Sequence, residues 1–168
     1  MLFIAPIFLS VLLAGASPAR RATCSPQILG ASISITNGPL EAGFSSTDST
    51  LVSQPISKAI PEFAVTASNS PGEFMLLKVT DKKLALTNAA HLPFVAPIPS
   101  PDSCMQNWAV ECSSCGSSGG ALIGAGCLVV SQFDGRCLNI SLSTTTPVRS
   151  PVTLGNCEAI GSSINIYT

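Results

Sequence analysis

Seven cysteines give this sequence its most reactive side chains, and their spacing limits the chemistry that they could perform. Cys112 and Cys115 form a C-x-x-C motif. A redox pair would need a βαβ context that the surrounding sequence lacks. A zinc site would need a second close pair, whereas Cys127 and Cys137 lie ten residues apart. We therefore predict no metal site and expect structural disulfides, formed within the motif or with Cys104 and Cys127.

The pair Cys137 and Cys157 is the clearest disulfide candidate. It would join the start of one predicted strand to the end of the next across a loop of about 20 residues, which is worth about 3 kcal/mol in the chain-entropy model. Because the number of cysteines is odd, at least one of them has no intramolecular partner.

Other reactive side chains give little support for catalysis. The single histidine, His91, lies in a proline-rich stretch with no Asp or Cys nearby to orient it. Paired carboxylates of the kind that hydrolyse glycosides would have to come from Asp102, Glu111, Asp134 and Glu158. Nothing around them selects two, and the glycine-rich stretch 115–120 lacks the lysine and helix of a phosphate-binding loop. We predict a protein that is not an enzyme, with no catalytic residues and no cofactor.

The sequence Asn139-Ile140-Ser141 is an N-glycosylation sequon, which is meaningful only in an exported protein. Residues 1–16 read as a signal peptide: an apolar stretch is followed by the small residues Ala14-Gly15-Ala16, and further trimming after Arg20-Arg21 is expected near residue 21. A retained membrane anchor is the alternative. All seven cysteines lie beyond this segment, so we expect a secreted, extracellular protein with no membrane segment in its mature form.

The balance of charge excludes nucleic acid as a partner. The 168 residues contain 8 Lys plus Arg against 9 Asp plus Glu, and no basic run is longer than Arg20-Arg21. Only 10% of the residues are charged while 46% are hydrophobic. Much of the surface must then consist of Ser, Thr, Asn and Gly, as in extracellular β proteins.

The elements that must position these residues are short strands. Apolar or alternating runs bounded by turn residues occur at 33–36, 74–79, 84–86, 128–130, 138–140 and 152–154. Asn37-Gly38, Asp81-Lys82 and Asp134-Gly135 stand where hairpin turns are needed. The stretch 56–62, confined by Pro55 and Pro61, is the one short helix that the sequence predicts.

A degenerate repeat organises these strands. An aromatic strand, starting at Phe63 or Trp108, is followed by a Ser/Gly-rich loop, an apolar hairpin and a proline-containing loop that reaches a cysteine. The chain ends with a third copy of the aromatic strand, Ile164-Asn165-Ile166-Tyr167. Three such units, none able to bury its own apolar face, would pool them in a closed all-β barrel with threefold symmetry, a β-trefoil over residues 24–168. Phe63, Trp108 and Tyr167 would be its core aromatics.

The last unit resembles one repeat of a ricin B-type lectin, from Arg136-Cys137-Leu138-Asn139-Ile140 through Cys157 to Tyr167. The middle unit adds the Q-x-W signature of that family as Gln106-Asn107-Trp108. The resemblance implies a β-trefoil that binds galactose-type sugars in a shallow pocket on each repeat. It also implies that the tryptophan is a core residue and not a sugar contact.

The chain departs from the family at all three types of sugar-binding position. The family's Asp is replaced by Asn139 and Ala85, its stacking aromatic by Gly155 and Asp102, and its polar residue before the Gln by Ile164 and Met105. Sugar hydroxyls are held by charged acceptors and amide donors, and the apolar sugar face by an aromatic plate. Neither unit supplies that set, so Asn139 and Asn165 are the remaining candidates, and a glycan on Asn139 would fill its own pocket.

The sequence therefore predicts a secreted, lectin-like module with eroded sugar sites. Two other functions stay open. The long loops 45–57 and 92–103 would suit a protein partner, as in a protease inhibitor or secreted effector, because prolines preset the backbone and lower the cost of ordering. A structural cell-wall or matrix protein would use the unpaired cysteine.

Overall fold

The computed structural model describes residues 23–45, 49–56, 61–89, 92–99, 103–116, 121–142, 149–159 and 161–168. These ranges form twelve strands and one 3-10 helix of three residues, so the predicted all-β class is confirmed. The predicted signal peptide, His91 and Asp102 lie outside the described residues. Among the residues that the structure does describe, no helix has the length and apolar character needed to cross a bilayer.

The strands fall into three units of four. Unit 1 contains β1 (Ser32–Asn37), β2 (Leu40–Phe44), β3 (Leu51–Pro55) and β4 (Phe63–Ala67). Unit 2 contains β5 (Phe74–Lys78), β6 (Asp81–Ala89), β7 (Leu92–Pro97) and, after the 3-10 helix η1 (Cys104–Gln106), β8 (Trp108–Cys115). Unit 3 contains β9 (Leu122–Ser131), β10 (Cys137–Asn139), β11 (Thr153–Gly155) and β12 (Ile164–Tyr167).

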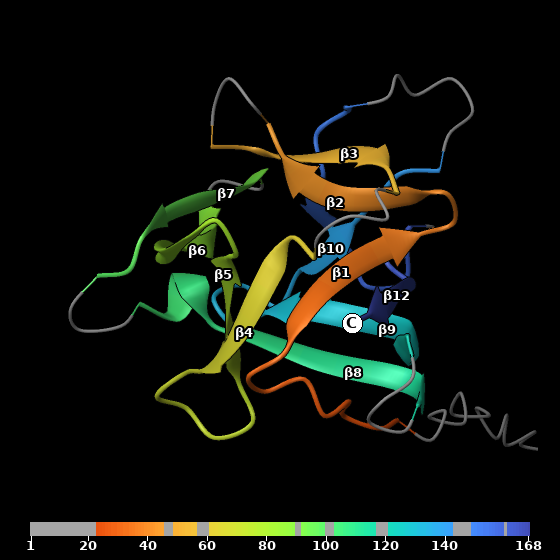
Figure 1. Ribbon diagram of the computed structural model, residues 1–168, viewed down its shortest axis with the longest axis horizontal. Helices are drawn as coiled ribbons and strands as arrows, with labels where there is room; N and C mark the ends of the chain where they lie inside the picture. Colours follow the sequence, from red (N-terminus) through yellow and green to blue (C-terminus); the bar gives the residue numbers. More distant parts are fainter. Residues whose placement is uncertain are drawn as a thin grey trace, which may run out of the picture.

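Six of the strands close a barrel. The first and last strands of each unit pair in the ring β1–β4–β5–β8–β9–β12 and back to β1, every pair being antiparallel. The two middle strands of each unit form the hairpins β2–β3, β6–β7 and β10–β11. Figure 1 shows β8 and β9 as the long strands on one side, with the β2–β3 hairpin at the opposite end. A six-stranded barrel with three hairpins is the predicted β-trefoil.

The strand register shows which residues of the three units are equivalent. The first residue of each closing strand pairs with a residue of the same unit's first strand: Phe63 with Ile33, Trp108 with Phe74, and Ile164 with Cys127. The three first residues of the closing strands, Phe63, Trp108 and Ile164, have at most 1% of their surface exposed. They form the common centre of the hydrophobic core.

The prediction that Tyr167 is a core aromatic is wrong. Side chains alternate along a strand, and Ile164 and Ile166 point inward on β12, so Tyr167 falls on the other face and is half-buried. The repeat Ile164-Asn165-Ile166-Tyr167 is in place, but its core residue is the first of the four and not the aromatic one. Ile164 fills the central position that Phe63 and Trp108 fill in the other units.

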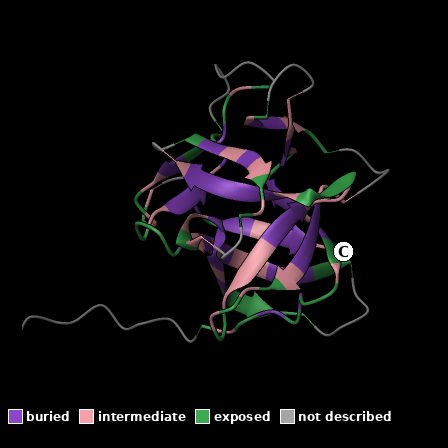
Figure 2. Ribbon diagram, turned by 90° about the vertical axis from the view of Figure 1, so that its left-hand side faces the viewer, coloured by how far each residue is buried: buried purple, intermediate pink, exposed green. Residues whose placement is uncertain are grey.

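The same alternation builds the rest of the barrel. On β8, Trp108, Val110 and Cys112 are buried while Ala109 and Glu111 are not. Figure 2 shows that burial is concentrated on the barrel strands and that exposure is greatest in the connections. Burying such apolar faces, at about 25 cal/mol per Å² of apolar surface, is the main stabilisation available to a chain with so few charges.

Turns occur close to their predicted places. Asn37-Gly38 connects β1 to β2, with Gly38 at a φ of 55°, and Asp134-Gly135 lies between β9 and β10. Asp81 instead begins β6, where its carboxylate accepts a hydrogen bond from the Lys83 amide. Of the stretch predicted as a short helix, residues 57–60 lie outside the described residues, and Pro61 and Glu62 are not helical.

Both segments predicted as long loops contain strands. Residues 51–55 form β3, and residues 92–97 form β7, whose partner along its whole length is β6. Pro93 and Pro97 are accommodated because β7 lies at the edge of the sheet. Between them, the Val95 amide donates outward to the carbonyl oxygen of Ser49 at 2.9 Å.

Three disulfides reinforce the barrel. The predicted Cys137–Cys157 bond is present and joins the start of β10 to the turn that follows β11. Cys112 pairs with Cys127, directly opposite on β9, and Cys115 pairs with Cys24, so the two cysteines of the C-x-x-C motif are not bonded to each other. Cys104 is exposed and free. The Cys24–Cys115 bond fastens the N-terminal segment to β8. Figure 1 shows this segment running beside β8.

Candidate functional site

The Gln and Trp side chains of the Q-x-W motif have a structural role. Trp108 is fully buried, and its indole Nε1 donates to the Leu86 carbonyl on β6 at 3.0 Å. Gln106 is 2% exposed, and its Nε2 donates to Thr87 Oγ1 at 2.9 Å and to the Pro97 carbonyl at 3.2 Å. The motif thus holds both strands of the β6–β7 hairpin onto the barrel, and neither side chain is available to a ligand.

A second polar network joins units 2 and 3 and runs from buried Asn88 to exposed Asp134. Asn88 is 1% exposed, and its Nδ2 donates to Ser131 Oγ and to Asp134 Oδ1, both at 2.8 Å. The other carboxylate oxygen of Asp134 lies 3.6 Å from Arg136 Nε. These contacts fix the turn between β9 and β10, so we assign this network to the fold.

The hairpin positions of the three units can now be aligned through the register. Thr36, Leu77 and Val130 each lie three residues after the residue of the first strand that pairs with the start of the closing strand. They pair with Glu41, Ala85 and Cys137, respectively. Two residues further along each second strand stand Gly43, Thr87 and Asn139. The middle-unit equivalent of Asn139 is therefore Thr87, and the expected alignment with Ala85 is shifted by two residues.

Thr87 and Asn139 occupy this position in different ways. Thr87 is 6% exposed and its hydroxyl is engaged, donating to the Ala85 carbonyl at 2.9 Å and accepting from Gln106. Asn139 is half-buried on β10, and its side-chain oxygen lies beside Gly161, where an added Cβ would collide with it. A side chain packed in this way has little freedom to contact a sugar.

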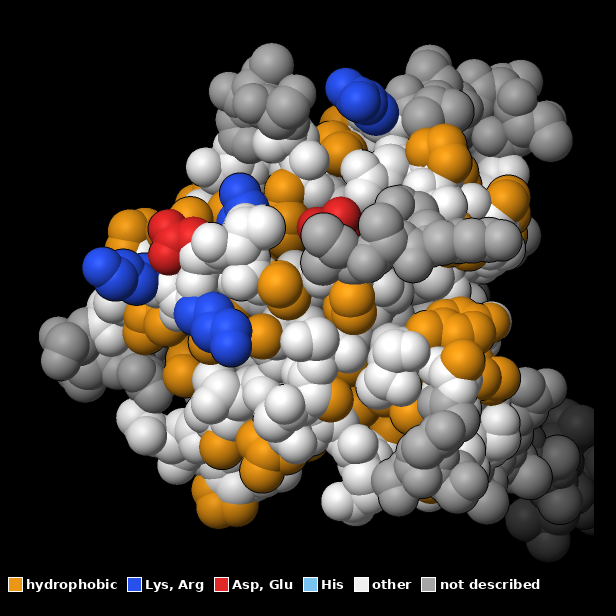
Figure 3. Space-filling view, in the orientation of Figure 1, with side chains coloured by type: hydrophobic (Ala, Val, Ile, Leu, Met, Phe, Trp, Pro, Cys, Tyr) orange, Lys and Arg blue, Asp and Glu red, His pale blue; other side chains and the backbone are white. Residues whose placement is uncertain are grey.

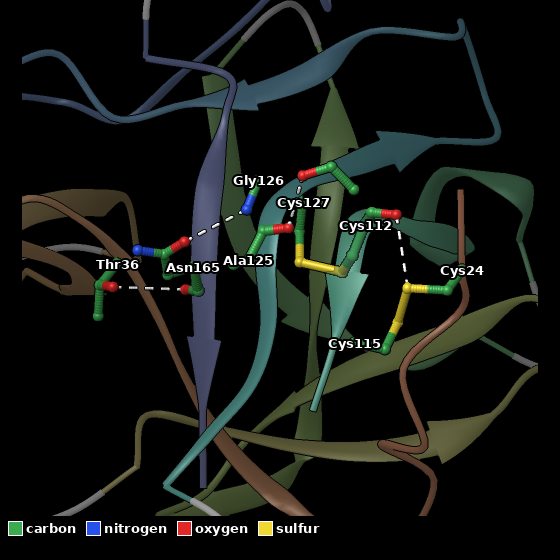
Figure 4. The surroundings of a disulfide bond; sticks show 9 residues. Cys24, Thr36, Cys112, Cys115, Ala125, Gly126, Cys127 and Asn165 are labelled. Atoms are coloured by element: carbon green, nitrogen blue, oxygen red, sulfur yellow. Dashed lines mark hydrogen bonds between the residues drawn. A yellow bond between two sulfur atoms is a disulfide. The ribbon is translucent and has the colours of Figure 1, made fainter. Parts of the chain in front are cut away.

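The other candidate, Asn165, serves the sheet. Its Oδ1 accepts a hydrogen bond from the Gly126 amide at 3.3 Å, and its backbone oxygen accepts from Thr36 Oγ1 at 3.4 Å, as Figure 4 shows. The hydrogen bond from the Gly126 amide links β12 to β9 where the pairing of these two strands is irregular. Asn139 lies on β10 and Asn165 on β12, and these two strands lie on either side of β9.

Unit 1, the unit least like the family in sequence, carries a cluster of polar side chains that the sequence analysis missed. Gln54 Nε2 donates to Glu41 Oε1 at 3.2 Å and to Glu62 Oε1 at 3.0 Å. Lys78 Nζ lies 5.2 Å from the ring centroid of Phe44, and its charge acts on Glu62. We call these five residues, Glu41, Phe44, Gln54, Glu62 and Lys78, the Glu62 cluster.

The strands of unit 1 position the cluster. Glu41 and Gln54 are direct partners on β2 and β3, and Lys78 pairs with Phe63, the residue after Glu62. Gly43 lets the Gln54 side chain lie across β2, because a Cβ on Gly43 would collide with the Gln54 amide. The Phe44 ring packs on Phe63 with centroids 5.3 Å apart.

The fold does not require the polar pair of buried Glu41 and half-buried Gln54. Glu41 has no exposed surface and faces Gln54, but the equivalent pairs are Ala85 with Ala96 in unit 2 and Cys137 with Gly155 in unit 3. Burying a carboxylate costs free energy that small side chains avoid. Two units show that small side chains suffice here, so the third has kept a costly arrangement that the architecture itself does not need.

Glu62 is the carboxylate of the cluster that is open to solvent in part. Burial raises the pKa of Glu62 above its ordinary value, and the neighbouring charge of Glu41 raises the pKa further. The hydrogen bond from Gln54 and the positive charge of Lys78 oppose the shift. Among the described residues, the side chain of Glu62 makes one hydrogen bond, through Oε1.

One feature of the sequence, the charged residue Glu41 on an apolar strand, indicates this site. Glu41 alternates with Gly43 on a strand that is otherwise buried, and a charged residue at such a position is unusual. Unit 1 lacks the cysteines and the Q-x-W motif, and the expected loop at 45–57 hid the strand that carries Gln54. Figure 3 shows few charged side chains on the face that carries β1, β2 and β4.

Solved structures with the same fold include toxins and a lectin. The cytolethal distending toxin of Haemophilus ducreyi is 17% identical, with a TM-score of 0.59 over 81% of each chain. The lectin of Polyporus squamosus, solved with a sialylated galactosyl epitope, is 11% identical, with a TM-score of 0.54 over 80% of this chain and 47% of the lectin. A designed threefold symmetric protein, ThreeFoil, is 9% identical, with a TM-score of 0.59 over 81% of this chain and 97% of its own.

At these identities the similarity shows a shared β-trefoil fold, and a fold alone does not fix a function. No protein-family model and no curated protein sequence matches the chain.

Proposed function

We propose that this protein is a secreted, lectin-like module of ricin B type that binds carbohydrate without catalysis, and that the Glu62 cluster is its binding site. The observation that carries the proposal is the pairing of buried Glu41 with half-buried Gln54 in unit 1, where the other two units have small side chains. In this proposal the function of the pair is to orient the Gln54 amide, which in turn orients the Glu62 carboxylate.

The cluster supplies the groups that sugar recognition uses. Glu62 offers a carboxylate acceptor, Gln54 an amide, and Lys78 a donor, while the partly exposed ring of Phe44 offers apolar surface. Hydroxyl groups suit the first three, and the apolar face of a pyranose suits an aromatic ring. The resemblance to ricin B-type lectins makes galactose-type sugars the first ligands to test.

The same geometry favours binding over hydrolysis. Glycoside hydrolysis uses two carboxylates that flank the scissile bond. Glu41 has no exposed surface, and it shares the Gln54 amide with Glu62. The cluster therefore offers a ligand one accessible carboxylate, which can bind a sugar but cannot supply the second group.

The proposal also places the protein outside the cell. Three disulfides are typical of oxidising compartments. In the same environment, Asn139 of the sequon Asn139-Ile140-Ser141 is our predicted N-glycosylation site.

A glycan array with the purified, disulfide-bonded protein tests the proposal. We expect binding to neutral galactose-containing glycans, and about a tenfold loss of affinity in Glu62→Gln, since a hydrogen bond to a charged group is worth about 1.5–3 kcal/mol. Glu158→Gln makes the same change of charge at an exposed residue of unit 3 and should bind as the wild type does.

Two results would count against the proposal. A wild-type protein that retains no glycan on the array would refute it. Equal affinity in wild type and Glu62→Gln would move the site elsewhere. The competing function, recognition of a protein, has lost its structural basis in part, because the two loops that supported it contain β3 and β7. A pull-down from the secreted fraction run beside the array would detect such a partner.

A further inference from the structure

A pocket with both polar and apolar lining opens on the outside of the barrel, away from the hairpin positions discussed above. Its volume is about 230 Å³, and it lies between β8, β9, the N-terminal segment and the residue before β12. The side chains and backbone that line it and matter for recognition are those of Thr23, Glu111, Ser113, Gly126, Leu128 and Ser163.

The barrel itself creates the walls of this pocket. Val110 and Cys112 are buried on β8, so the alternating residues Glu111 and Ser113 face outward. The opposite wall is the N-terminal segment at Thr23, held by the Cys24–Cys115 disulfide and by the backbone hydrogen bonds between Cys24 and Cys112.

The space exists because residue 126 is glycine. Gly126 has a φ of 59°, and a Cβ at this residue would collide with Ser113 Oγ and approach Ser163 Oγ to 3.6 Å. The Gly126 amide is held by Asn165 Oδ1, as Figure 4 shows. The floor of the pocket is therefore backbone fixed in place by hydrogen bonding, and the serine hydroxyls of Ser113 and Ser163 stand on either side of it.

The chemistry of the lining selects a neutral ligand rich in hydroxyl groups. Glu111 is the one charged side chain in the lining, and its carboxylate would accept hydrogen bonds and repel anions. Ser113 Oγ donates to the Ala125 carbonyl at 3.0 Å, so its lone pairs remain to accept from a ligand. Thr23 and Ser163 add hydroxyls that donate or accept, and Leu128 adds an apolar patch.

The size of the pocket selects a small ligand. Its volume lies below the roughly 300–1,000 Å³ of pockets for drug-sized molecules. A single sugar ring combines small size, several hydroxyls and an apolar face. We propose that this pocket is a second carbohydrate subsite, which binds one neutral monosaccharide unit. The ligand class of this inference rests on the proposed function. With the Glu62 cluster as the first site, the pocket makes the module bivalent.

Nuclear magnetic resonance on the isotope-labelled, disulfide-bonded protein tests this directly. The probes are the methyl glycosides of galactose, glucose, mannose and N-acetylglucosamine. We expect at least one of them to shift the backbone amides of Ser113, Gly126 and Ser163 in a saturable way. The same shifts should persist in Glu62→Gln, since that change affects the first site alone.

Variants then separate ligand recognition from structure. Glu111→Gln should weaken the response at the pocket about tenfold, because it removes the charged acceptor. Glu158→Gln is its matched control and should leave the response unchanged. Ser163→Phe should abolish the response by filling the pocket from an exposed position.

Each outcome decides the inference. Shifts at the pocket that Glu111→Gln weakens and Glu158→Gln does not would support it. Shifts confined to the surroundings of Gln54 and Glu62 would overturn it and leave the proposed function standing. Shifts at the pocket that are equal in Glu111→Gln and wild type would also overturn it. No shift at either place with any glycoside would overturn both proposals.

Discussion

The indole nitrogen of Trp108 donates a hydrogen bond of 3.0 Å to the backbone carbonyl of Leu86, and neither residue has any exposed surface. This contact ties the closing strand of unit 2 to the hairpin of the same unit. Trp108→Phe would leave the buried Leu86 carbonyl without its donor and would also remove packing volume. We expect a loss of about 2–3 kcal/mol in the free energy of unfolding, measured by chemical denaturation with circular dichroism.

The control for this variant is Phe133→Leu, which changes an aromatic residue that is 45% exposed. We expect a change within about 0.5 kcal/mol, as for other surface substitutions. Equal effects of the two substitutions would contradict the structural role of the Q-x-W tryptophan.

Asn165 should matter for stability and not for glycan binding at the Glu62 cluster. Asn165→Ala leaves the Gly126 amide without its acceptor, and we expect a loss of about 1 kcal/mol in denaturation experiments. Glycan affinity at the Glu62 cluster should be unchanged. A variant of wild-type stability that no longer binds glycans would show that Asn165 contacts sugar after all.

Gly43 and Gln54 should be coupled. Gly43→Ala places a Cβ where the Gln54 amide lies, so we expect it to displace Gln54 and to reduce glycan affinity about tenfold. Gln54→Ala alone should have a similar effect, and the double variant should be no worse than either single variant. Titration calorimetry on the wild type, the two single variants and the double variant measures this double-mutant cycle. Additive losses of affinity would argue that Gly43 acts through something other than Gln54.

The pH dependence of stability should reveal Glu62. Because its pKa is raised in the folded protein, the folded state binds more protons than the unfolded state between the ordinary glutamate pKa and the raised value. The contribution of Glu62 to the free energy of unfolding is therefore fully favourable below that window and is lost as the pH rises through it. In Glu62→Gln this loss should disappear, which urea denaturation at a series of pH values would show.

Glu158→Gln is again the control, and it should reproduce the pH profile of the wild type. An identical fall in stability in Glu62→Gln would mean that another group titrates in that window.

The disulfides should be reduced in the order of their exposure. Cys112 and Cys127 are fully buried, whereas Cys115 is exposed and Cys24 and Cys157 are half-buried. Under mild reducing conditions we expect Cys24–Cys115 to open first and Cys112–Cys127 last, because a reductant must reach the sulfur. Alkylation followed by mass spectrometry reports the order, with Cys104 labelled before any reductant is added. Labelling of Cys112 ahead of Cys115 would contradict this prediction.

Much of the fold could be predicted from the sequence because the repeat is carried by core residues. The phrases around Phe63 and Trp108 recur with their hairpins, and Cys137 and Cys157 stand at the ends of a single hairpin. The core residue of the third repeat was misplaced because Tyr167 looks more like Trp108 than Ile164 does. Apolar pattern alone does not reveal register, since Ile164 and Ile166 both point inward on the same strand.

The candidate site was out of reach for a different reason. Glu41, Gln54 and Glu62 come from three segments, and their proximity depends on the pairing of β2 with β3 and on the path into β4. Proline at positions 93 and 97 made β7 resemble a loop, although an edge strand tolerates both. Side chains that meet only through strand pairing leave no local pattern in a sequence.

The outer border of β7 has a consequence for solubility. Pro93 and Pro97 have no amide hydrogen, and the amide of Val95 between them is already given to Ser49. A strand of another molecule would therefore find no free amide donor at residues 93, 95 and 97. Another molecule cannot extend the sheet at the outer edge of β7, so this edge protects the protein against fibrillar aggregation.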